Sequence, residues 1–271
     1  MRIWVTSHYS QARQFYISQT PSEQDHILAA LVFELSKCAE PAIRVRMVAH
    51  LLNIDDALAQ NAAARLGLDA MPEPAPASRR TRIDLKPSAA LSIQANPPGT
   101  FKGRVMGVLL SDGFDGALLA ALEAAVADAG GLMRFIAPKI GGVSCSKNTL
   151  HPVTDKIGGA PSVLFDAVVV MPGDDSLATN PAAMAFLTDA FVHCKFIGWS
   201  KEASTLVQVC GLRGEADQGL VGFTDPSSAT DFVAACAALR HSPREERFTS
   251  QAAWTAAQDL RRGRHFPPRP A

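Results

Sequence analysis

Apolar positions in the first seventy residues recur every three or four residues, which is typical of amphipathic helices. The first predicted helix begins at Thr20 in a capping box, with Pro21 at its first helical position. Its apolar face is formed by Ile27, Leu28, Leu31, Val32 and Leu35. A second helix begins near Pro41, and a third runs from Asp55, its expected N-cap, to Gly67. Three such helices can form a small all-helical bundle, and each also needs a surface to cover.

From residue 101 onward, continuous apolar runs alternate with helical patterns. The expected strands cover 104–110, 132–137, 166–171, 196–200 and 219–223. Between and after them we expect helices at 116–129, 180–193, 201–209 and 226–239. Fully apolar strands separated by helices predict an α/β fold with a doubly wound parallel sheet. Two Gly-Gly pairs between Pro138 and Pro161 indicate a small antiparallel excursion.

A change of composition separates these two parts. Residues 71–78 are rich in proline and alanine, which favours an extended linker, and Asn96-Pro97-Pro98-Gly99 ends it with turn residues. We therefore predict a helical region at 1–70, a linker at 71–100 and an α/β domain at 101–240. Residues 241–271 are expected to form a polar tail, with one weak helix around Trp254.

Composition narrows the classes of function. The chain has 271 residues, which suggests two domains, and 47% hydrophobic residues exclude wholesale disorder. Equal numbers of basic and acidic residues, 26 each, argue against a nucleic-acid partner. Five cysteines without CxxC spacing argue against structural zinc and favour a reducing, cytoplasmic setting. No apolar run approaches the ~20 residues of a membrane span, so no membrane partner is expected.

Ligands of open parallel sheets bind at the carboxyl ends of the strands, which makes 111–116, 171–175 and 199–202 the candidate segments. The first lacks both GxGxxG and GxxxxGK[ST], and its two aspartates would repel a phosphate, so a turn capped by Asp is the better interpretation. Asp174 and Asp175 could bind a cation, although consecutive acids after Pro-Gly are typical of a solvated turn.

The remaining candidates have structural interpretations. Ser200 stands where a nucleophile elbow would lie, but the Gly-x-Ser-x-Gly frame is missing and a helix N-cap is the better interpretation. No HxxxH or HExxH spacing predicts a metal site, and His193 near a helix end fits an interaction with the helix dipole. Cys210 and Cys236 are expected to pack in the core.

Several longer strings resemble haem catalases of the large-subunit type. Residues 8–68 resemble the helical region after the haem core, through the runs 8–13, 19–24, 33–37 and 46–53. Residues 97–240 resemble the extra C-terminal domain, through the runs 97–104, 115–119, 137–142, 162–167 and 190–198. The resemblance covers about four fifths of the chain. It implies a flavodoxin-like domain similar to the DJ-1/PfpI family.

The resemblance also implies where haem chemistry would reside. In catalases a large β-barrel supplies a distal His, a distal Asn and a proximal Tyr within an Arg-x-x-x-Tyr motif, and we expect this chain to follow that barrel. Its only tyrosines are Tyr9 and Tyr16, and Arg13 stands one residue too close to Tyr16 for the motif. We therefore predict no catalytic, haem-binding, other cofactor-binding or metal-ligating residue in this chain.

The DJ-1/PfpI resemblance implies a cysteine at the strand–helix elbow beside a glutamate of the first helix. The elbow falls at Trp199–Ser200, and the position that aligns with the glutamate is Leu118. Cys194 precedes the strand. We therefore expect both the reactive cysteine and its partner glutamate to be absent.

These observations predict a truncated large-subunit catalase without an active site of its own and with an assembly or stabilising role. The expected partner is a second copy of the chain or a separately encoded catalase core. One alternative is a small-molecule-binding protein or DJ-1/PfpI-like enzyme, with residues 111–116 and 199–202 lining its pocket. Another is catalase activity in a full assembly of which this chain is one subunit.

Overall fold

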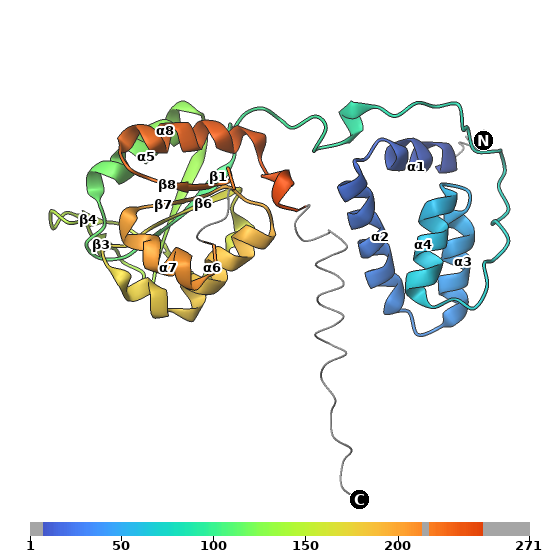
Figure 1. The fold of residues 1–271 in the computed structure, drawn as a ribbon, viewed down its shortest axis with the longest axis horizontal. Coiled ribbons are helices and arrows are strands. Elements are labelled where there is room, and N and C mark those ends of the chain that lie inside the picture. The colour runs from blue at the N-terminus through green and yellow to red at the C-terminus, as the bar shows by residue number, and fades with distance from the viewer. Residues whose placement is uncertain (1–7, 213–216, 246–271) are drawn as a thin grey trace, which may run out of the picture. The chain divides into compact units, whose positions relative to one another are not determined.

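The computed structural model describes residues 8–212 and 217–245, in two units that divide between Pro97 and Pro98 (Figure 1). The weak helix expected around Trp254 lies outside the described residues. Within those residues, no helix is long and apolar enough to cross a membrane.

The first unit contains the three predicted helices and one more before them. Its helices are α1 (His8–Ile17), α2 (Pro21–Ser36), α3 (Pro41–Leu51) and α4 (Asp56–Leu66). The capping box at Thr20 and the N-cap at Asp55 are confirmed, and Gly67 ends α4 in the left-handed conformation with φ of 68°. The side chains of Leu28, Val48, Leu51, Leu58, Ala59 and Ala62 form its core.

The expected extended linker is attached to this helical unit over much of its length. The Thr81 hydroxyl donates to the carbonyl of Asn53, and the backbone N–H of Arg82 donates to the Ser10 hydroxyl. Further on, the Glu23 carboxylate accepts hydrogen bonds from the Ser92 hydroxyl, the Ile93 N–H and the Gln94 N–H at 2.7, 3.0 and 3.1 Å. The segment therefore does not act as a free spacer between residues 81 and 94.

The second unit is built on a six-stranded parallel sheet in the order β5-β2-β1-β6-β7-β8. Its strands are β1 (Val105–Leu110), β2 (Leu132–Ala137), β5 (Asp155–Lys156), β6 (Ala167–Met171), β7 (Ile197–Trp199) and β8 (Leu220–Gly222). Without the short edge strand β5, this order is that of flavodoxin-like folds. The predicted doubly wound, flavodoxin-like α/β class is confirmed.

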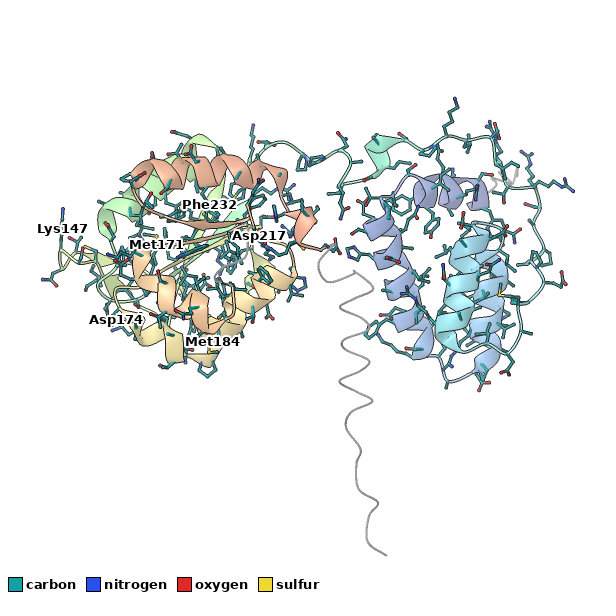
Figure 2. The ribbon with its side chains drawn as sticks, in the orientation of Figure 1. Lys147, Met171, Asp174, Met184, Asp217 and Phe232 are labelled. Atoms are coloured by element: carbon teal, nitrogen blue, oxygen red, sulfur yellow. The ribbon has the colours of Figure 1, made fainter. Side chains whose placement is uncertain are left out.

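Helices cover both faces of the sheet (Figure 1). The helices are α5 (Gly116–Asp128), α6 (Pro181–Val192), α7 (Ser204–Val209) and α8 (Pro226–Ala235). α5 and α8 pack on one face over a core that includes Met171 and Phe232, both labelled in Figure 2. α6 and α7 pack on the other face around Val168 and Val170. All strand residues of β6 are buried, which explains their unbroken apolar run.

Two features depart from the expected pattern. The excursion after Pro138 does contain an antiparallel pair, β3 (Val143–Ser144) with β4 (Leu150–His151), but the chain then adds β5 to the edge of the main sheet. The expected polar tail from residue 241 begins inside the α/β unit, because Arg244 is fully buried. A bidentate carboxylate partner makes that burial tolerable, as described below.

Replacing Glu23 by Gln should release the segment around Ser92. Burial opposes the charge of Glu23, but its hydrogen bonds to Ser92, Thr20 and Gln94 outweigh that effect and lower its pKa. The charge-assisted contacts contribute about 1–3 kcal/mol, so cleavage by thermolysin before Leu91 and Ile93, beside the released contacts, should accelerate clearly in E23Q. Wild type should show the same acceleration as the pH falls below the usual Glu pKa of 4.5 and through the lowered one, and there pepsin, which is active in acid, is the protease.

The matched control is E34Q, since Glu34 lies on the same helix and pairs with the exposed Lys37. Peptide mapping by mass spectrometry locates the cuts. Equal cleavage rates in E23Q and E34Q would show that Glu23 does not hold the segment.

Candidate functional site

Backbone closes the crevice in which flavodoxin-like domains hold ligands. The segments after β1 and β6 meet there, and the Gly173 N–H donates to the Ser111 hydroxyl at 3.1 Å. A Cβ atom built on Gly173 would lie 2.1 Å from the carbonyl oxygen of Asp112 and 2.5 Å from Cα of Gly113. The first candidate segment is therefore a packed turn, and Asp115 caps α5 through the N–H groups of Ala117 and Leu118, as predicted.

The acidic candidates are exposed and locally satisfied. Asp174 accepts a hydrogen bond from the Ser176 N–H at 3.0 Å, and Asp175 begins a 3₁₀ turn beside it. Asp112 accepts from the Ser144 N–H at 2.8 Å. Among the described residues, no three side chains of the types that bind metals lie together. The interpretation of 174–175 as a solvated turn fits this geometry.

The elbow after β7 has lost the features of a nucleophile site. Ser200 is 2% exposed, and its φ of −77° is ordinary extended backbone. It occupies the N-cap position of a 3₁₀ turn, but its hydroxyl makes no capping bond and has no hydrogen-bond partner among the described residues. Leu118 is packed in the core opposite, and burial raises the pKa of the Cys194 thiol. No acid–thiolate pair forms here.

The two tyrosines do not fit haem ligation. The Tyr9 hydroxyl is hydrogen-bonded to Nδ1 of His50 at 2.6 Å. Burial raises the pKa of Tyr16, and the nearby charges of Asp55 and Asp25 raise it further. A tyrosinate ligand needs the opposite effect. Arg13, the only residue near proximal spacing, instead donates to Asp55 and to the carbonyl of Ile54.

A cavity of about 320 Å³ lies beside the first turns of α5 and the β3–β4 hairpin. Its lining includes Phe114, Gly116, Glu123, Cys145 and His151. The His151 ring packs edge-on against Phe135 at 4.3 Å between centroids, and its Nε2 lies 3.4 Å from a Glu123 carboxylate oxygen. The alternative from the sequence placed a pocket along 111–116 and 199–202. The cavity uses part of the first segment, and its other wall comes from the hairpin.

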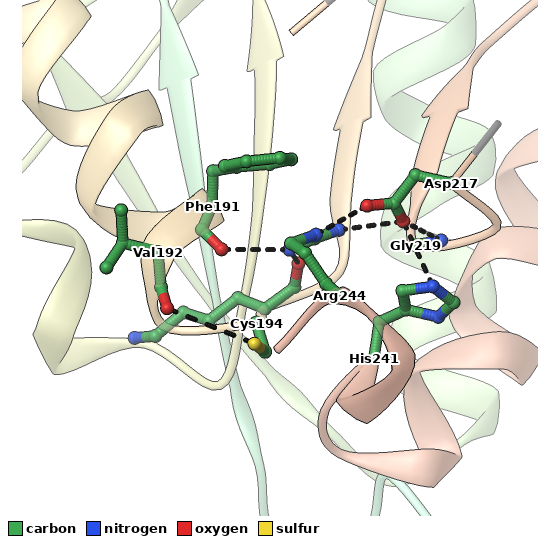
Figure 3. Close-up of polar contacts among 8 residues, drawn as sticks. Phe191, Val192, Cys194, Asp217, Gly219, His241 and Arg244 are labelled. Atoms are coloured by element: carbon green, nitrogen blue, oxygen red, sulfur yellow. Dashed lines mark hydrogen bonds and ion pairs between the residues drawn. The ribbon is translucent and has the colours of Figure 1, made fainter. Parts of the chain in front are cut away.

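The most deeply buried charges form a separate cluster (Figure 3). Arg244 and Asp217 are both fully buried and pair in a bidentate arrangement at 2.6 and 3.1 Å. Arg244 also donates to the carbonyl of Lys195 at 2.7 Å, while Asp217 accepts from the Gly219 N–H and contacts His241 at 3.2 Å. Burial opposes the charge on Asp217, but Arg244 outweighs it and lowers the pKa.

Lys195 is the other buried cation of this region. Its ammonium group donates to the carbonyls of Ser162 and Phe165, and burial together with the charge of Arg240 lowers its pKa to about 8. These contacts are all to backbone carbonyls, and they anchor the turn before β6. Lys195 and Arg244 were both missed by sequence reasoning. A lone charge beside apolar residues is the sole local signal for Lys195, and Arg244 lies in a polar stretch that gives no signal of burial.

Taken together, the geometry defines a flavodoxin-like α/β domain without a nucleophile at its elbow, preceded by a four-helix unit. Two family matches agree with this division. Residues 5–66 match the family described as catalase-related immune-responsive, and residues 102–248 match the C-terminal domain found in long catalases. The chain belongs to the family that carries this long-catalase C-terminal domain.

Individual relatives support the assignment. The chain is 48% identical to Catalase C of Rhizobium meliloti over 88% of its length, and 36% identical to Catalase HPII of Pseudomonas putida over 88%. It is 31% identical to Catalase-2 of Bacillus subtilis over 86%. It spans 34%, 33% and 34% of these relatives, which is about a third of their length.

Replacing Arg244 by Met should destabilise the α/β unit by about 3–5 kcal/mol, because Asp217 would keep a buried charge without its partner. The double variant R244M/D217N should recover more than half of the loss, since it removes the stranded carboxylate. Hydrogen exchange of peptides from β1 and β6 in urea reports on this unit alone. If the unfolding free energy of R244M lay within 1 kcal/mol of the wild-type value, the ion pair would be dispensable for stability.

Proposed function

We propose that the described residues are the haem-free, non-catalytic part of a long catalase, and that they serve assembly or stability of a haem-containing core. The family context is hydrogen peroxide decomposition, which the matched families and relatives support. The observation that carries the proposal is the environment of Tyr16, whose raised pKa is unsuited to a haem ligand, while the nearby Arg13 pairs with Asp55.

Apolar side chains on the outer surface of the helical unit supply a physical basis for assembly. Phe15, Phe33, Ile43 and Val45 are 47%, 62%, 38% and 40% exposed, although the helices already bury Leu28 and Val48 in their own core. Helices with apolar residues on two sides are suited to lie between two layers. A catalase core is the proposed second layer, because the relatives are about three times longer than this chain.

The rival function, a DJ-1/PfpI-like enzyme, needs a thiolate and an acid at the elbow. The positions that would hold them carry Ser200 and Leu118, both buried and neither able to ionise at neutral pH. The elbow therefore supports a scaffold function over that chemistry.

Purified chain, supplied with haem during expression, should lack a stoichiometric Soret band and release no oxygen from hydrogen peroxide above the buffer rate. A full-length long catalase prepared in the same way is the positive control. A Soret band at one haem per chain, with oxygen release, would overturn the non-catalytic part of the proposal.

Co-expression with the haem-containing portion of a related long catalase, lacking its last third, should yield a complex that resists heat inactivation better than the portion alone. F33S should weaken the association about tenfold or more, since burying an aromatic ring contributes about 1.5–3 kcal/mol. Q60S, an exposed polar change on α4, is the matched control and should leave the association unchanged.

Sedimentation of the chain alone separates the two kinds of partner. A tight homodimer that F33S dissociates, without any complex with the catalase core, would overturn the core as the partner of this surface.

A further inference from the structure

The cavity beside α5 gathers side chains that the proposed function does not use. Cys145 from the turn after β3, Glu123 from α5 and His151 from β4 all line it, and the cavity measures about 320 Å³. A Cβ atom built on Gly116, which also lines the cavity, would lie 3.4 Å from the Cys145 sulfur. The sulfur therefore borders the cavity at the first turn of α5, although the residue as a whole is only 8% exposed.

The surroundings of this sulfur favour a thiolate. The backbone N–H groups of Lys147, first, and of Thr149 favour the charged form and lower the pKa of the Cys145 thiol. Burial instead raises the thiol pKa of Cys194, Cys210 and Cys236. A thiolate is the nucleophilic form of cysteine, so Cys145 differs chemically from these three.

The opposite wall of the cavity is ordered. His151 is held by its contact with Glu123 and by edge-on packing against Phe114 and Phe135, at 6.0 and 4.3 Å between centroids. The side chain of Lys147 lines the same cavity and brings a positive charge to it. A lysine beside the cavity suits a reaction in which an oxygen leaving group gains negative charge.

We propose that this cavity is a peroxide-reactive thiol site, in which the Cys145 thiolate attacks hydrogen peroxide. A sulfur–oxygen bond forms and the oxygen–oxygen bond breaks, so that the thiolate is oxidised to a sulfenic acid and the peroxide is reduced. The departing hydroxide takes a proton from solvent and becomes water. The reaction uses no haem and no partner protein, so it goes beyond the proposed assembly role.

The test is made on the full 271-residue chain with all its cysteines. Hydrogen peroxide is added in the presence of dimedone, which traps sulfenic acids, and the adducts are counted by mass spectrometry of tryptic peptides. Cys38, Cys145 and Cys210 fall in separate peptides, 38–44, 140–147 and 202–213, so two cysteines serve as internal references. Cys145 should form its adduct about tenfold faster than either reference. A rate no higher than that of Cys210 would overturn the proposal.

Two variants of α5 test whether the cavity is the route to the sulfur. G116V keeps Cys145 and fills the space beside its sulfur, so trapping at Cys145 should slow about tenfold while trapping at Cys38 is unchanged. A120V places the same valine side chain at an exposed position of the same helix outside the cavity lining, and it should react like wild type. G116A serves if the larger side chain impairs folding. Wild-type rates in the folded cavity variant would overturn the assigned site.

Discussion

A buried ion pair holds the last described segment of the α/β unit against the sheet. Arg244 reaches from the last described segment to Asp217, just before β8, and to carbonyls at the end of α6 and the start of β7. Sealing these charges from water is costly unless every donor is used. Here the guanidinium has a bidentate carboxylate, two carbonyls and the face of Phe191, and the carboxylate has Gly219 and His241 in addition.

The same unit has a flavodoxin-like frame. Ser200, after β7, and Leu118, in α5, both pack in it as ordinary interior residues. The tight approach of Gly113 and Gly173 fills the neighbouring crevice with backbone. Reactive side chains collect instead around the β3–β4 hairpin, an insertion that the sheet itself does not need.

Sequence periodicity predicted the strands and helices well, because a buried parallel strand such as β6 must be apolar throughout and the caps Thr20, Asp55 and Asp115 have strong local signatures. It failed where the deciding contact joins distant residues. Arg244 lies in a polar stretch and is buried only because Asp217 meets it in space. The two-residue strand β5 has no periodicity to detect, and the cavity around Cys145 depends on a hairpin folding back against α5.

Both units anchor a segment through a charged side chain, but the two anchors differ in their exposure to water. In each, a charged side chain helps to tie a segment that holds only a short 3₁₀ turn to a folded body. Glu23 does so from a partly exposed position, where water can compete for its hydrogen bonds to Ser92 and Gln94. Because its carboxyl group has a lowered pKa, these hydrogen bonds weaken when acid protonates it. Arg244 is sealed from water together with Asp217, its bidentate partner. Consequently the segment around Ser92 can detach while the helices stay folded, whereas residues 241–245 must unfold with the sheet that they complete.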